Sequence, residues 1–169
     1  TIAGLARALA AAEAAGASAT RQTAVAAAAM RFPLTDRQAD LWFTHLMQQD
    51  ETAYYVAVAF RARSALDLAA LDHAVAELVA RHDALRTCIV DGAQEAIPAA
   101  GNRLYVEGEV RHHLDEAEVQ AWVRDCASRP FAFATEGSFR VHVLPVNQTE
   151  HVVVIVTHHL FADGKAVAI

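Results

Sequence analysis

The segment 139–160 constrains the fold of this chain more than any other segment. It reads FRVHVLPV, a polar NQTE stretch and HVVVIVTHHL, which predicts two strands joined as a hairpin. The run VVVIV places apolar side chains on both faces of its strand, because successive side chains point to opposite sides of a sheet. Such a strand lies inside a sheet rather than at its edge. We therefore expect an α/β fold, an α+β sandwich in which helices pack on a mixed sheet.

Hydrophobic periodicity predicts the helices of this fold. Thr35 and Gln38 have the spacing of a capping box, and a helix is expected to follow them. The clearest helical pattern covers 66–85, where bulky apolar residues keep to one stripe. A further helix is expected to start at Asp115, with Val119, Trp122, Val123 and Cys126 on its buried side.

Alternating patterns predict the remaining strands. Residues 54–63 and 103–110 each read as a strand. Residues 86–97 read as a hairpin, in which Asp91 and Gly92 supply a turn that needs positive φ.

The N-terminal part of the chain has a different character. Residues 1–15 predict an Ala-rich helix with Ile2, Leu5 and Leu9 on one face. The segment that follows, up to residue 31, is rich in small residues and weakly patterned. We interpret it as an interdomain linker, with a short Ala-rich helix as the alternative.

Composition excludes several classes of protein. A chain of 169 residues is long enough for one domain with a core, and its net charge of −6 argues against nucleic-acid binding. No run of eighteen apolar residues predicts a membrane span, and the N-terminus has no secretory signal pattern. Cys88 and Cys126 are expected to be buried thiols in a reducing compartment, so we expect a cytoplasmic protein.

Nine histidines in one chain raise the question of a metal site. The pair His112-His113 falls between a strand and a helix, and we interpret it as part of a solvated connection. Four others fall singly on predicted helices or strands and are expected to be surface or satisfied core residues: His45, His73, His142 and His151.

The pair His158-His159 differs, because it ends the apolar strand and is followed by Asp163-Gly164. Neighbouring side chains on a strand face opposite ways, so the two histidines do not share one cavity. A zinc ion would also need a third protein ligand, and no HExxH pattern exists, so we expect no metal here. One histidine could face a cleft and accept a proton. A purely structural strand-to-helix turn, with Gly164 as its flexible residue, stays open as an alternative.

Four stretches, which follow one another along the chain in the order usual for the family, resemble the motifs of condensation domains in nonribosomal peptide synthetases. HHLFADG (158–164) fits the pattern HHxxxDG, and PLTDRQADLWF (33–43) is similar to the first motif of the family. RHDALRT (81–87) is similar to the second motif, and RPFAFATEGSFRVHVL (129–144) resembles a later one. The chain departs from these patterns at Asp83 for the usual Glu, Ala132 for the usual Asp and Ser138 where proline is common.

The resemblance implies a chloramphenicol acetyltransferase-like lobe over residues 32–169, the N-terminal lobe of a two-lobed domain whose C-terminal lobe is absent. Residues 1–12 resemble the last helix of a carrier domain, and residues 13–31 would then be the linker; a plain Ala-rich leader helix is the alternative. With one wall of the tunnel only, this lobe alone is expected to be inactive.

The resemblance also implies a reaction and its partners. An upstream carrier presents an acyl or peptidyl thioester on 4′-phosphopantetheine, and a downstream carrier presents the amine that attacks it. His159 is implied to accept a proton or to position the amine. His158, Asp163 and Gly164 are implied to support the motif, and Asp163 to pair with Arg81 or Arg86. No cofactor or metal bound directly to this chain is expected, and neither nucleic acid nor membrane is an expected partner.

Other readings of the same motif remain open. An ester-forming acyltransferase would use a hydroxyl acceptor, an epimerisation domain carries the same pattern, and a non-catalytic lobe could simply bind carriers. Heterocyclisation domains have aspartates at the histidine positions, so the sequence disfavours that branch.

Overall fold

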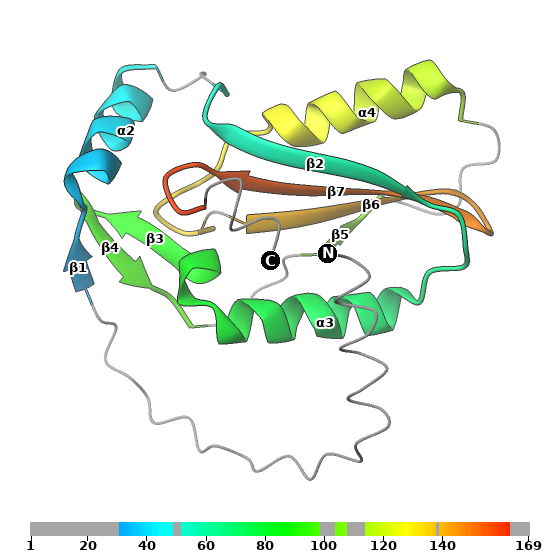
Figure 1. Cartoon of the computed structure of the whole chain (residues 1–169), viewed down its shortest axis with the longest axis horizontal. Coiled ribbons are helices and arrows are strands. Elements are labelled where there is room, and N and C mark those ends of the chain that lie inside the picture. The colour runs from blue at the N-terminus through cyan, green and yellow to red at the C-terminus, as the bar shows by residue number, and fades with distance from the viewer. Residues whose placement is uncertain (1–30, 49–51, 99–103, 108–113, 138, 163–169) are drawn as a thin grey trace, which may run out of the picture.

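The computed structural model describes residues 31–48, 52–98, 104–107, 114–137 and 139–162 (Figure 1). The helix predicted over 1–15 and the pair His112-His113 lie outside these ranges, as does the linker except for Arg31, the first residue of β1. Within them, helices pack on a mixed sheet, so the expected α/β fold is confirmed. No helix in the described ranges is long and apolar enough to cross a membrane.

The main sheet has four strands in the order β2 (Tyr55–Ala62), β7 (Glu150–His158), β6 (Phe139–Asn147) and β5 (Leu104–Val106). β7 lies between β2 and β6 and pairs with both antiparallel, so the prediction of an interior strand is confirmed. β5 pairs parallel with β6 and, as described, is shorter than the segment 103–110 predicted for it.

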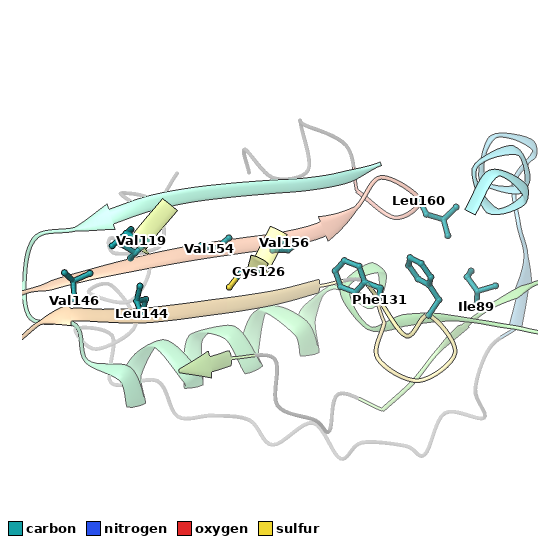
Figure 2. Packing of buried hydrophobic residues seen from close by; sticks show 11 residues of the cluster. Ile89, Val119, Cys126, Phe131, Leu144, Val146, Val154, Val156 and Leu160 are labelled. Atoms are coloured by element: carbon teal, nitrogen blue, oxygen red, sulfur yellow. The ribbon is translucent and has the colours of Figure 1, made fainter. Parts of the chain in front are cut away.

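Helices α4 (Glu116–Ser128) and α3 (Leu68–Arg81) cover opposite faces of this sheet (Figure 1). Successive residues of β7 point alternately toward α4 and toward α3, because side chains alternate between the two faces of a strand. Val154 belongs to the core cluster with Val119 of α4, whereas Val153 packs with Val79 of α3. Figure 2 shows the α4-side cluster following the strands toward the end of β7.

The predicted hairpin over 86–97 forms, but it does not join the main sheet. β3 (Thr87–Val90) and β4 (Ala93–Ala96) make a separate three-stranded sheet with β1 (Arg31–Pro33), in the order β1-β4-β3. Its turn uses positive φ at Asp91 (49°) and Gly92 (73°), as the sequence predicted. β4 pairs with β1 because the chain before α2 runs alongside it, a contact between distant segments that no local pattern encodes.

The helix ends are set by local caps. α2 (Asp36–Met47) begins with the predicted capping box of Thr35 and Gln38. The helix predicted over 66–85 is shorter than expected: α3 ends at Arg81, because His82 takes an extended conformation, and Asp83–Arg86 forms a separate 3₁₀ turn. The α4 helix begins at the cap Asp115, as predicted.

Candidate active site

The histidine pair lies where β7 leaves the sheet. His158 is the last residue of β7, and the backbone N–H of His159 donates to the carbonyl of Tyr54 at 2.8 Å, which continues the pairing with the β2 side by one bond. His158 is only 1% exposed, whereas His159 is partly exposed. The two imidazoles therefore occupy different environments, in line with the alternation expected from the sequence.

The imidazole of His158 is enclosed by aromatic rings. Its centroid lies 4.9 Å from that of Phe133 and 5.3 Å from that of Tyr55, both in edge-to-face geometry. His45 of α2 approaches to 6.1 Å. Burial, followed by repulsion from His45 and His159, lowers the pKa of His158 to about 4. The ring is thus neutral at physiological pH and poorly placed to exchange protons with a substrate.

His158 holds the turn that follows it. Its Nδ1 accepts a hydrogen bond from the backbone N–H of Leu160 at 3.1 Å. Its carbonyl accepts from the N–H of Phe161 at 3.0 Å and from that of Ala162 at 3.3 Å. One residue therefore fixes both ends of the short turn that contains His159. The remaining motif residues, Asp163 and Gly164, lie outside the described residues.

The two arginines of the second motif differ in their surroundings. Arg81 is exposed in the last turn of α3. Arg86 is mostly buried, with 20% of its side chain exposed, and its Nη2 lies 2.6 Å from Oδ1 of Asp83. Its Nη1 donates to the carbonyl of Ile97, and its buried Nε has no hydrogen-bond partner among the described residues. Of these two arginines, Arg86 is therefore the more buried one, and its Nε–H is the donor without a partner among the described residues.

Sequence reasoning missed Arg140, which is fully buried in β6. Its guanidinium donates to the carbonyls of Arg129 and Pro130, and its Nε lies 3.6 Å from Oε1 of Glu136. Its Cζ lies 3.9 Å from the ring centroid of Phe131. This arginine holds the segment that also carries Phe133, the ring packed on His158. The sequence signal was a charged residue within a largely apolar strand.

Two of the single histidines, His142 and His151, are buried. Among the described residues, His142 Nε2 and His151 Nδ1 have no hydrogen-bond partner. Burial, followed by the charge of Arg140, lowers the pKa of His142 to about 4. Packing of the sheet under α4 explains the burial: His142 stacks on Tyr105 at 5.2 Å. The described residues contain no group of three or more His, Cys, Asp and Glu that could hold a metal.

We expect the chain to lose stability as the pH falls from about 6.5 to about 4. The folded-state pKa values of His158 and His142 are lowered from 6.5 to about 4, so the unfolded state binds more protons across this window. Their stabilising contribution is complete above about pH 6.5 and is lost during acidification, with at most about 3.4 kcal/mol per histidine. Denaturant unfolding at a series of pH values measures the free energy of unfolding as a function of pH. His142→Phe should flatten the profile, and an equally steep profile in that variant would contradict the assignment.

Two comparisons with known sequences give concordant matches. A family model described as "Condensation domain" matches residues 29–169. The isonitrile lipopeptide synthase of Mycobacterium tuberculosis is 35% identical over 146 residues, which is 80% of this chain and 6% of that protein. The dimodular nonribosomal peptide synthase of Bacillus subtilis is 30% identical over 136 residues, again 6% of its length. The chain thus spans a small part of these relatives.

Solved structures agree on the fold. The X-domain in a complex with OxyB from teicoplanin biosynthesis superposes with a TM-score of 0.71 at 27% identity, over 82% of this chain and 30% of that one. The first condensation domain of the calcium-dependent antibiotic synthetase superposes with a TM-score of 0.69 at 21% identity, over 82% and 35% of the two chains. In each superposition this chain matches about a third of the solved chain.

Proposed function

Because the chain belongs to the condensation-domain family, we propose that it forms part of an acyltransferase that joins a carrier-bound acyl or peptidyl thioester to the amine of a second carrier-bound group. The observation that carries the proposal is the histidine pair at the end of β7, where one imidazole is sealed in the core and the next is partly exposed. In this arrangement His159, at the end of a rigid strand, is the one imidazole of the pair that a substrate could reach.

The proposed reaction is an aminolysis. The amine nitrogen attacks the thioester carbonyl, a C–N bond forms, the C–S bond breaks, and the carrier leaves as a thiolate that takes up the proton released by the amine. The attacking nitrogen must lose a proton, and His159 would accept it or hold the amine by a hydrogen bond. Two tethered reactants held in one site gain most of their rate from proximity and orientation.

His159 is a better candidate for this role than His158. His158 is buried, its Nδ1 already accepts the N–H of Leu160, and its lowered pKa makes it a weak base. The backbone N–H of His159 donates to the carbonyl of Tyr54, so the backbone, and not the imidazole, holds this residue at the strand end. We therefore propose His159 as the catalytic residue and His158 as its structural support.

The other motif residues have supporting roles in this proposal. Asp163 would pair with an arginine, and Arg86 is favoured over Arg81, since Arg86 is mostly buried and its Nε has no partner among the described residues. A buried charge of this kind is stabilised by an opposite charge. Gly164 would provide the backbone freedom with which the chain leaves the turn.

The proposal includes the wider organisation of the protein. Residues 1–12 would be the last helix of an upstream carrier domain, residues 13–31 its linker, and residues 32–169 the N-terminal lobe, with a C-terminal lobe completing the tunnel. Upstream and downstream carriers would deliver their substrates on 4′-phosphopantetheine, and this lobe itself would bind no cofactor.

Intact-protein mass spectrometry tests this function. A synthetase that contains this domain together with both carriers is loaded with a donor acyl thioester and an acceptor aminoacyl thioester. We expect the donor mass to disappear from the upstream carrier and to be added to the downstream carrier as an amide. An acceptor with a hydroxyl in place of the amine tests for ester formation. Carrier binding without any transfer would contradict the proposal and favour a non-catalytic lobe.

A further inference from the structure

A side chain of the first motif, Gln38, contacts the backbone next to the candidate catalytic histidine. Gln38 is the third residue of α2, and its Nε2 donates to the carbonyl of Leu160 at 3.1 Å. Leu160 directly follows His159 and is buried. Figure 2 shows Leu160 between the end of β7 and helix α2. One amide therefore ties the start of a helix to a turn that is distant in the sequence.

A second glutamine fixes the orientation of this amide. Gln38 Nε2 lies 3.0 Å from Gln94 Oε1, and Gln94 Nε2 lies 3.1 Å from Gln38 Oε1, so the two side chains form a reciprocal pair. Gln94, in β4, also donates to the carbonyl of Pro33 at 3.1 Å. Both glutamines are half-buried. The pair joins the small sheet, the start of α2 and the histidine turn at one point.

Capping alone does not account for a glutamine at this position. Gln38 Oε1 accepts from the N–H and from the hydroxyl of Thr35, each at 3.0 Å, which is the acceptor part of a capping box. Glutamate serves that part equally well, and its charge favours the N-terminus of a helix. An ionised glutamate only accepts, whereas the amide of Gln38 accepts from Thr35 and at the same time donates to Leu160.

We propose that Gln38 is a positioning residue for His159: its amide holds the peptide after the histidine against α2 and so fixes the direction of the imidazole. This inference rests on the function proposed above for His159. Gln38 acts through the backbone and contacts no substrate. Loss of its donor would let the turn between β7 and the rest of the motif shift, and small misplacements of a reacting group are costly in rate.

The test separates the two hydrogen-bonding tasks of Gln38 with two variants of the carrier-containing synthetase. Gln38→Glu keeps the cap and removes the amide donor, and with it the hydrogen bonds to Leu160 and to Gln94 Oε1. Thr35→Ala removes the side-chain cap and keeps that donor. We expect Gln38→Glu to lower kcat by roughly tenfold to hundredfold with KM for the loaded carriers unchanged. Thr35→Ala should leave kcat near the wild-type value.

Hydrogen-exchange mass spectrometry supplies a readout that does not depend on activity. In Gln38→Glu, amide exchange should become several-fold faster in the peptide that covers Leu160 to Ala162, whereas in Thr35→Ala it should become faster only in the first turn of α2. Unchanged exchange at 160–162 in Gln38→Glu, or a wild-type kcat, overturns the inference. If the wild-type protein performs no condensation, the proposed function fails, and the exchange contrast alone decides whether Gln38 holds the turn.

Discussion

Replacing His159 by alanine is expected to lower the rate of condensation by about 10²–10⁴-fold, the range typical of a lost general acid or base. The side chain is partly exposed, and the turn is held by the backbone and by His158, so folding should be little affected. Single-turnover transfer between loaded carriers, followed by mass spectrometry, measures the rate. Denaturant unfolding should show a change in the free energy of unfolding below about 1 kcal/mol.

Two further variants make this result interpretable. His73 is exposed on α3, so His73→Ala controls for the loss of a surface imidazole and should condense at the wild-type rate. His159→Gln retains a hydrogen-bonding side chain that accepts no proton at neutral pH. Partial activity with a flattened pH profile in that variant favours positioning of the amine over proton transfer. A near-normal rate in His159→Ala would refute both roles.

Replacing Arg140 by alanine is expected to destabilise the fold by about 3–5 kcal/mol, the range measured when one partner of a buried ion pair is removed. The side chain is fully buried, its nearest charge is Glu136 with 14% exposed, and it satisfies the carbonyls of Arg129 and Pro130. The variant removes the donor to the carbonyls of Arg129 and Pro130 and the guanidinium beside Glu136, in the segment that carries Phe133. Denaturant unfolding measures the loss.

Arg61 provides the matched control for this prediction. It also pairs with glutamates, Glu116 at 2.6 Å and Glu150 at 2.8 Å, but 31% of its side chain is exposed. Because solvent screens such pairs, Arg61→Ala should cost less than about 1 kcal/mol. Arg140→Met combined with Glu136→Gln should recover part of the stability lost in Arg140→Ala, because methionine fills the space and no carboxylate has lost the guanidinium beside it. Equal losses at Arg61 and Arg140 would contradict the role of burial.

Local patterns in the sequence determined most of the elements of this fold. The run of valines before His158 required an interior strand, and β7 is that strand. The cap at Thr35 and the Asp91-Gly92 turn were predicted and are present, because each depends on residues within a few positions of one another. The ordered motifs likewise predicted the family, because each motif consists of consecutive residues that can be recognised without the fold.

Tertiary structure decided what each polar residue near the site does. The sequence placed His158 and His159 on opposite faces, but only the packing of Phe133 and Tyr55 determined that His158 is the sealed one. No periodicity predicts that Arg140 lies in the core or that Gln38 reaches Leu160. Such contacts join residues far apart in the chain, and they depend on how the layers pack together. Burial and neighbouring groups determine the protonation state of a side chain and the groups that it can contact, so its role depends on the assembled fold.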